Sequence, residues 1–303
     1  VAIAKGDVPQ SHWLHLGRPV AQVDGTRVLL SWNGTMFEYL MPCLWMRNYA
    51  GALLEQSCRA AVRRQNVYGR QKGVPWGISE SGYYRFDAGM HYQYRGFGVP
   101  GLGFRRGLAE DLVVAPYASL LALPLFAQEV MQNVERLIEL GMLGRYGFYE
   151  AVDYTRSRLP ADQKSAIVRS FMVHHQSMIL LSLDNYLQGE PIVRRFHADP
   201  RVQSVELLLH EQVPLQSPLE HPRPEEVRPL RRAQPQVVVA PWRVPVDTPM
   251  PQVHVLSNGR YTVLVTNAGS GYSTWREVAL TRWRADTTLD DWGMWIYVQD
   301  CES

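Results

Sequence analysis

Residues 126–141, FAQEVMQNVERLIELG, decide the fold class, because they predict a helix with a single apolar face. Charged residues occupy the opposite face, and Gly141 follows the helix as a candidate C-cap. The apolar residues recur at helical spacing: Val130, Val134, Leu137 and Ile138. We expect an amphipathic helix on the outside of a helical fold.

Two further segments are apolar nearly all round, as is typical of helices that are covered on every side. They are residues 111–123, DLVVAPYASLLAL, and residues 165–187, SAIVRSFMVHHQSMILLSLDNYL. Half-buried and fully buried helices that occur together suggest two concentric layers, as in an α/α toroid. Simple helical stacking is the alternative that periodicity leaves open. The predicted class is mainly α for residues 1–213.

The chain changes character after Val213. Ten prolines between residues 214 and 251 exclude a helix and predict a Pro-rich connector. Residues 252–275 then read as two alternating strands around Asn258-Gly259, a dipeptide preferred in hairpin turns. Residues 292–300, WGMWIYVQD, predict a further strand. We therefore expect residues 252–303 to be the first antiparallel strands of a β-sandwich.

Composition excludes several classes of protein. A formal net charge of +2 gives little reason to expect nucleic acid as a partner. Cys43, Cys58 and Cys301 form no CxxC pair, which argues against a disulfide framework and a zinc site and favours reduced thiols in a cytosolic setting. No apolar run is long enough to span a bilayer. We expect no metal and no cofactor. The chain starts without Met, and we expect it to be a fragment of a longer protein.

Aromatic residues lie next to carboxylates in the loops between the predicted helices. Aromatic rings can contact the C–H groups of sugars, and carboxylates can bind hydroxyls or act on a glycosidic oxygen. Glycoside chemistry needs two carboxyl groups at the scissile bond. This pattern indicates a carbohydrate site. The predicted site residues are Glu38, Trp76, Glu80, Tyr83, Tyr84, Tyr149, Glu150 and His174.

Each carboxylate also has a structural interpretation. Glu38 can be an exposed or helix-capping glutamate, although its apolar neighbours favour a perturbed, functional group. Glu80 can belong to the acidic first turn of a helix that Ser79 or Ser81 starts. Glu150 suits a substrate hydrogen bond or a pair with an arginine better than catalysis.

His174 and His175 are adjacent in a predicted helix, so their side chains point about 100° apart and cannot share a metal ion. We interpret them as buried, hydrogen-bonding histidines. One of them, which we take to be His174, can reach the sugar site.

Five segments in this order resemble the glycoamylase-like domain of bacterial cyclic β-1,2-glucan synthases. The resemblance runs from about His12 to Val213, and residues 253–300 look like the opening β-sandwich of the family's phosphorylase-like region. The five segments are LSWNGTMFEYLMP, VPWGISESGYY, RGLAEDLVVAPYASLLAL, GRYGFYEAVDYT and FMVHHQSM.

This resemblance implies the C-terminal part of an (α/α)6 toroid over residues 1–213, a connector over 214–251 and the start of a β-sandwich over 252–303. It implies a retaining transglycosylase that closes linear β-1,2-glucan into a ring, with Glu38 as nucleophile and the acid/base on a helix before Val1. The other predicted site residues bind substrate. It also implies that residues 252–303 carry no catalytic group.

The resemblance also implies a location and partners. The chain would be a soluble segment of a membrane protein, on the cytoplasmic side of the bacterial inner membrane and without membrane contact of its own. Its partners would be a β-1,2-glucan chain and the rest of the parent polypeptide. Two alternatives stay open: an endo-β-1,2-glucanase and a noncatalytic glucan-binding module.

Overall fold

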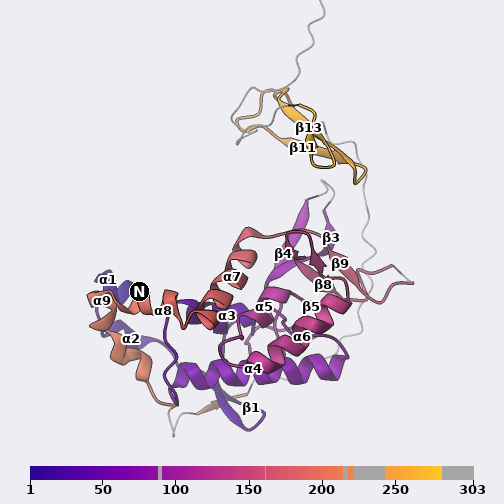
Figure 1. The fold of residues 1–303 in the computed structure, drawn as a ribbon. Helices are drawn as coiled ribbons and strands as arrows, with labels where there is room; N and C mark the ends of the chain where they lie inside the picture. Colours follow the sequence, from indigo (N-terminus) through magenta and orange to yellow (C-terminus); the bar gives the residue numbers. More distant parts are fainter. Residues whose placement is uncertain (88–90, 161, 214–217, 222–242, 282–303) are drawn as a thin grey trace, which may run out of the picture. The chain divides into compact units, whose positions relative to one another are not determined.

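The computed structural model describes residues 1–87, 91–160, 162–213, 218–221 and 243–281. The chain divides into two compact units, residues 1–235 and 236–303, and this division falls inside the expected Pro-rich connector. Figure 1 shows the helices and strands in sequence colours.

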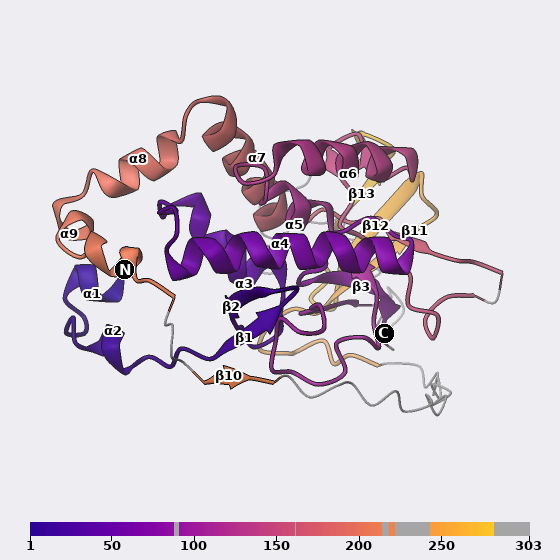
Figure 2. The same ribbon diagram turned by 90° about the horizontal axis from the view of Figure 1, so that it is seen from below.

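The first unit combines one long helix, α4, with shorter helices. Figure 2 shows α6 running alongside α4. The described helices of this unit are α1 (Ala2–Lys5), α2 (His12–His15), α3 (Met36–Leu40), η1 (Met41–Leu44), α4 (Leu53–Lys72), α5 (Pro116–Leu120), α6 (Ala127–Glu139), α7 (Val173–Leu187), α8 (Pro191–His197), α9 (Pro200–Gln203) and η2 (Glu206–His210).

Short strands alternate with these helices along the chain and pair into small sheets. The expectation of a mainly helical region therefore holds only in part. β10 (Leu219–Glu220), within the expected connector, pairs in parallel with β1. The remaining pairs are antiparallel. The strands are β1 (Val20–Val23), β2 (Thr26–Leu29), β3 (Ser81–Phe86), β4 (Tyr92–Arg95), β5 (Val113–Val114), β6 (Leu143–Gly144), β7 (Gly147–Phe148), β8 (Ala151–Asp153) and β9 (Ala166–Val168).

The helix predicted over residues 126–141 is confirmed as α6. Val130 and Leu137 are buried, whereas Ile138 is 44% exposed. Gly141 has φ +78°, and its N–H donates to the carbonyl of Ile138, so it ends the helix as expected. The apolar spacing identified the helix, and the glycine that follows identified its C-terminal end.

The helix predicted over residues 111–123 is wrong in conformation but right in burial. Pro116 begins the five-residue α5, and Ala115 before it is extended at φ −111° and ψ 126°. A proline disfavours the helical region for the residue before it, and its ring would kink or break a helix that ran through this point. The segment is instead the short strand β5 followed by α5, with most of its apolar side chains in the core.

The helix predicted over residues 165–187 is shorter and less covered than expected. β9 occupies residues 166–168, and α7 begins only at Val173. The buried residues of α7 follow one face, whereas Leu180 is 66% exposed and Leu187 is 68% exposed. Within the described residues, α7 is therefore covered on one side only.

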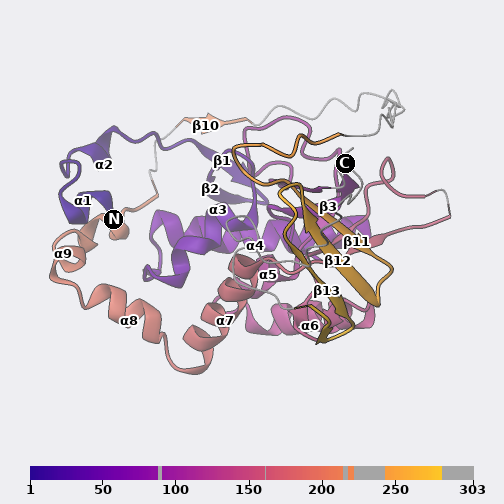
Figure 3. The ribbon, with the colours of Figure 1, turned by 90° about the horizontal axis from the view of Figure 1, so that it is seen from above.

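The N-terminal segment of the first unit lies against α9 and the residues after η2. Figures 1 and 3 both show α1 beside α9. The guanidinium of Arg18 donates to both carboxylate oxygens of Glu211, at 2.8 and 2.9 Å. This bidentate pair connects the N-terminal segment to the chain that follows η2.

The second unit contains a four-stranded antiparallel sheet within its described residues. Its strands are β11 (Val253–Ser257), β12 (Tyr261–Thr266), β13 (Gly271–Trp275) and β14 (Val278–Ala279). The predicted hairpin is confirmed: β11 pairs with β12, and Gly259 adopts φ +81° in the turn. The strand predicted over residues 292–300 lies outside the described residues.

Gly98 lies where its backbone approaches the loop of Asn33. A Cβ atom on Gly98 would come within 1.6 Å of the carbonyl oxygen of Asn33. We therefore expect Gly98→Ala to lower the free energy of unfolding by about 1–3 kcal/mol, the usual cost of overpacking. Gly17→Ala is the matched control, because its Cβ would have only an ordinary contact at 3.8 Å with Pro19. Urea denaturation would contradict this prediction if both variants unfolded at the same midpoint.

Candidate active site

Glu38 lies in the first turn of α3 and caps it. The Thr35 hydroxyl accepts from the Glu38 backbone N–H at 3.1 Å, and the Glu38 carboxylate accepts from the Thr35 backbone N–H at 2.9 Å, which together form a capping box. Oε2 also accepts from the hydroxyls of Ser31 and Thr35. Among the described residues, Oε1 accepts from the Asn33 backbone N–H alone, at 3.1 Å. The capping interpretation of Glu38 is thus present in the structure, and Oε1 is the oxygen with capacity for another partner.

Glu38 also lines a cavity of about 150 Å³ between α3, η1 and α4. This volume is below the roughly 300–1,000 Å³ that is usual for ligand pockets. None of the other predicted site residues lines this cavity. Residues that line it include Ser31, Tyr39, Cys43, Met46, Leu54 and Cys58.

Glu80 lies immediately before β3, next to the start of α3. The Phe37 backbone N–H donates to the Ser79 hydroxyl at 3.0 Å, so the residues before Glu38 and Glu80 are in direct contact. Burial raises the pKa of the Glu80 carboxyl, and the charge of Glu38 raises it further. Glu80 is half-buried and belongs to a loop and strand rather than to the helix start that was considered.

Glu150 is 2% exposed and has two partners. Its Oε1 accepts from the Gly82 backbone N–H at 2.9 Å, and its Oε2 contacts His175 Nδ1 at 2.9 Å. Gly82 permits this approach, because a Cβ there would come within 3.2 Å of Glu150 Cγ. The partner of Glu150 is therefore a histidine and not the arginine that was considered.

The two histidines of α7 have different surroundings. His174 is exposed, whereas His175 is 2% exposed and stacks on Tyr117 with ring centroids 3.7 Å apart. Both Nε2 atoms lie near the Tyr94 hydroxyl, at 3.3 Å for His174 and 3.2 Å for His175. Among the described residues, no group of three or more metal-ligating side chains comes together.

Trp76, which was predicted to contact the substrate, lies in the core of the first unit. Its side chain is 3% exposed, and its backbone exchanges two hydrogen bonds with the Asn133 amide, at 2.8 and 2.9 Å. A Cβ on Gly69 of α4 would lie 3.0 Å from Trp76 Cβ, which shows how closely the two segments approach. Trp76 is a core residue that joins α4 to α6, so its ring is not available to a sugar.

The predicted tyrosines lie around β3 and β7. Tyr83 is half-buried, and the guanidinium of Arg158 lies 4.8 Å from its ring centroid. Tyr84, the next residue along the chain, is 38% exposed. Tyr149 is half-buried, and its ring centroid lies 5.3 Å from that of Phe171. Of these three, Tyr84 has the most exposed ring.

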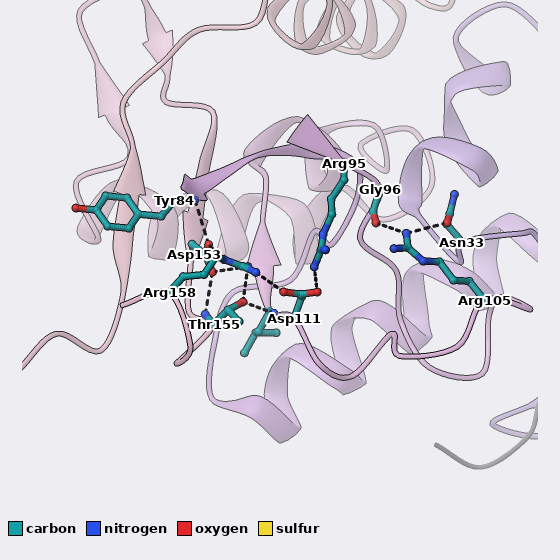
Figure 4. Close-up of polar contacts among 10 residues, drawn as sticks. Asn33, Tyr84, Arg95, Gly96, Arg105, Asp111, Asp153, Thr155 and Arg158 are labelled. Carbon is teal, nitrogen blue, oxygen red and sulfur yellow. Dashed lines mark hydrogen bonds and ion pairs between the residues drawn. The ribbon is translucent and has the colours of Figure 1, made fainter. Parts of the chain in front are cut away.

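An ion-pair network anchors β3 and β4 to the core (Figure 4). Arg158 donates to both carboxylate oxygens of Asp153, at 2.7 and 3.0 Å, and also pairs with Asp111. Asp111 pairs in turn with Arg95 of β4. The Tyr84 backbone N–H donates to Asp153 at 3.1 Å, which ties β3 to the same network. This network fixes the hairpin on which Tyr83 and Tyr94 lie.

The sequence did not indicate Tyr94, and it led to His174 and not to His175. His175 contacts Tyr94, Glu150 and Tyr117. The sequence contains a signal for His175, because the apolar residues Met178 and Ile179 follow it by three and four positions and so lie on the same helix face. In the structure the buried residues of α7 are His175, Met178, Ile179, Ser182 and Asn185. No local signal identifies Tyr94. It reaches the site because β4 pairs with β3 in a register that sets it opposite Gly82.

Comparison with known proteins gives two family matches. Residues 3–200 match the Glycoamylase family model, described as putative glucoamylase. Residues 238–303 match the supersandwich domain of glycosyl hydrolase 94. Among the described residues, no helix is both long enough and apolar enough to cross a membrane.

The chain is 41% identical over 302 residues to the cyclic beta-(1,2)-glucan synthase NdvB of Rhizobium meliloti (strain 1021). This alignment covers 99% of the chain but only 11% of the length of that relative. It confirms the resemblance to cyclic β-1,2-glucan synthases that the five sequence segments predicted.

Two solved structures are more distantly similar. An endo-beta-1,2-glucanase from Chitinophaga pinensis, in complex with sophorotriose and glucose, has a TM-score of 0.45 at 18% identity, over 64% of this chain and 46% of that chain. A beta-1,2-glucanase from Parabacteroides distasonis has a TM-score of 0.43 at 18% identity, over 62% and 26%. Likeness at this level has no weight for fold or function. Because its family model covers residues 3–200 of 303, the chain belongs to the glycoamylase family of putative glucoamylases.

Proposed function

We propose that this chain is a β-1,2-glucan-processing segment of a cyclic β-1,2-glucan synthase. In this proposal it forms the C-terminal part of an (α/α)6 toroid and takes part in retaining transglycosylation, in which a linear glucan is closed into a ring. The 41% identity to a cyclic β-1,2-glucan synthase supports the substrate class. No cofactor is part of the proposal.

The observation that carries the proposal is that the segments of Glu38 and Glu80 are joined directly before these two residues. They follow two residues in direct contact, Phe37 and Ser79, and the charge of Glu38 contributes to the raised pKa of Glu80. Glycosyl transfer requires carboxyl groups at the scissile bond, and in this proposal Glu80 binds the substrate beside Glu38.

In this proposal Glu38 is the nucleophile. Four donors hold its carboxylate in one orientation, and in the part of the chain that the structure describes Oε1 has the Asn33 N–H alone as a partner. Attack of Oε1 on the anomeric carbon would form the glycosyl-enzyme that retention needs. The acid/base on a helix before Val1 stays a prediction from the resemblance.

The exposed apolar side chains of α7 support the toroid. Leu180 and Leu187 are 66% and 68% exposed, and Tyr186 between them is 48% exposed. In a toroid, a neighbouring helix would cover this face. The cytoplasmic location, the absence of direct membrane contact and the boundaries at residues 213 and 251 stay predictions.

A glucan-binding module is the second candidate, because the capping box gives Glu38 a structural function without chemistry. In that case the carboxylates and tyrosines would only hold the glucan. An endo-β-1,2-glucanase would use the same residues, with water as the acceptor.

Product analysis distinguishes these functions. The polypeptide that carries this segment is incubated with linear β-1,2-glucan, and the products are separated by mass spectrometry. We expect rings, which are one water lighter than linear chains and have no reducing end. Linear oligomers with new reducing ends would instead identify a hydrolase, and unchanged glucan that is nevertheless bound would identify a binding module.

A further inference from the structure

Two cysteine side chains from different helices meet in the wall of the cavity beside Glu38. Cys43 lies in η1 and Cys58 lies in α4, and their Sγ atoms are 3.8 Å apart. At this distance the two sulfurs are in van der Waals contact but are not bonded. Both are free thiols, and both line the cavity.

One backbone carbonyl holds the two thiols together. The Tyr39 carbonyl accepts from Cys58 Sγ at 3.1 Å and lies 3.8 Å from Cys43 Sγ. A disulfide needs the sulfurs to approach further, to about 2 Å. Because both sulfurs already lie at the same carbonyl oxygen, this approach needs only a small movement of the two side chains.

The two thiols differ in their tendency to ionise. Cys43 is half-buried, whereas Cys58 is buried. The hydrogen bond with Cys58 lowers the pKa of Cys43, although burial acts against it. The same hydrogen bond, together with burial, raises the pKa of Cys58. Because the thiolate is the nucleophile, Cys43 is the sulfur that reacts first and Cys58 is the one that follows.

The cavity is large enough for a small oxidant. Its volume of about 150 Å³ has room for several water molecules. Hydrogen peroxide is larger than water by one oxygen atom only. A molecule of peroxide in this cavity would therefore contact the sulfurs of Cys43 and Cys58, both of which belong to the lining.

We propose that Cys43 and Cys58 form a redox-sensitive pair, which hydrogen peroxide converts into a reversible disulfide. Cys43 loses its proton to solvent, and its thiolate attacks one peroxide oxygen. The O–O bond breaks, which gives Cys43 sulfenic acid and hydroxide. Cys58 loses its proton to this hydroxide, and its sulfur attacks the Cys43 sulfur. The S–O bond breaks as the S–S bond forms, and the hydroxide that leaves takes up a proton. Two thiols and one peroxide thus give one disulfide and two water molecules.

The disulfide changes the segment that carries Glu38. It removes the S–H group of Cys58, so the Tyr39 carbonyl loses this donor. It also ties η1 directly to α4. Disulfides in reducing compartments are usually transient and report oxidation, which fits a pair that is free in the ordinary state. This inference goes beyond the proposed function and does not depend on it.

Peptide mapping of the full chain tests the pair without glucan. The wild type and Cys301→Ser, which keeps only these two thiols, are treated with hydrogen peroxide, alkylated and digested with trypsin without reductant. Cleavage after Arg47 places the two cysteines in separate peptides, residues 28–47 and 48–59. We expect the two peptides to appear joined, with the loss of two hydrogens, and to separate after treatment with dithiothreitol.

Three results of this mapping would overturn the proposal. They are free thiols at both positions after treatment, sulfinic acid on Cys43 in place of the link, and a link to Cys301 in place of the link between the pair. Met46 also lines the cavity and is in the same peptide as Cys43. An oxygen gained by Met46 while both thiols stay free would show that peroxide reached the cavity and that the pair does not close.

Single variants test the order of the two steps. In Cys58→Ser the serine hydroxyl can still donate to the Tyr39 carbonyl, so the local structure has a substitute for the lost thiol. Peroxide should then leave a sulfenic acid on Cys43 that dimedone captures. Cys43→Ser is the matched control, and its Cys58 should give much less dimedone adduct. Equal capture at the two positions would overturn the assignment of Cys43 as the first sulfur to react.

Discussion

Glu38→Gln is expected to abolish ring formation while the chain stays folded. The variant loses the charged oxygen that would attack the anomeric carbon, so turnover should fall by about 10³-fold or more, the scale seen when a reacting group is removed. Glutamine also satisfies a capping box at this position of the helix. The amide oxygen can still accept from the Thr35 backbone N–H, which now donates to Glu38 at 2.9 Å.

Glu38→Ala separates the capping function from the chemical one. It leaves the N–H groups of Asn33 and Thr35 without their acceptor and is expected to cost about 1–2 kcal/mol of stability, as for other lost helix caps. Glu135→Gln on the exposed face of α6 is the control, and it should change neither property. Rates of ring formation and thermal unfolding are measured for all three variants. A Glu38→Gln protein that cyclises glucan at the wild-type rate would remove Glu38 from the chemistry and favour the binding module.

The same substitution tests the electrostatic link between the two carboxyl groups. The charge of Glu38 is one cause of the raised Glu80 pKa, so Glu38→Gln should lower that pKa toward its ordinary value. Carboxyl ¹³C NMR of the labelled chain would follow the Glu80 titration in both proteins. An unchanged Glu80 titration would mean that the two groups do not interact.

Local signals predicted the elements whose determinants are local. The α6 pattern with its C-capping Gly141, and the hairpin around Asn258-Gly259, each depend on a few neighbouring residues, and both are confirmed. The error over residues 111–123 was avoidable, because Pro116 already disfavoured one continuous helix.

The polar contacts at the site depend on distant pairings, which one sequence does not specify. Tyr94 meets His175 across 81 residues, and Arg158 meets Asp111 across 47. Cys43 and Cys58 looked unrelated, yet their Sγ atoms lie 3.8 Å apart as free thiols in the wall of the cavity beside Glu38. The pattern of aromatic residues next to carboxylates supplied candidates such as Glu38 and Glu80, but only the fold shows which groups they contact.

Arg158→Met is expected to produce the largest loss of stability in the first unit. Asp153 has no exposed side-chain surface, and Arg158 is its cationic partner (Figure 4). Removal of one member of a buried pair leaves the other charge uncompensated, which costs about 3–5 kcal/mol. The methionine side chain would still fill much of the space beside the Tyr83 ring, so the loss would report charge rather than volume.

Arg201→Met is the matched control, because Arg201 binds Asp199 with the same two-bond geometry, at 3.0 and 2.6 Å, in an exposed position. It should leave the urea midpoint unchanged, since exposed pairs contribute little. The double variant Asp153→Asn with Arg158→Met removes both charges, so it should lose less stability than the two single variants together. Equal midpoints for Arg158→Met and Arg201→Met would show that burial does not strengthen this network. The hairpin that carries Tyr83 and Tyr94 would then need another anchor, because Arg95 and the Tyr84 N–H reach the core through the same two aspartates.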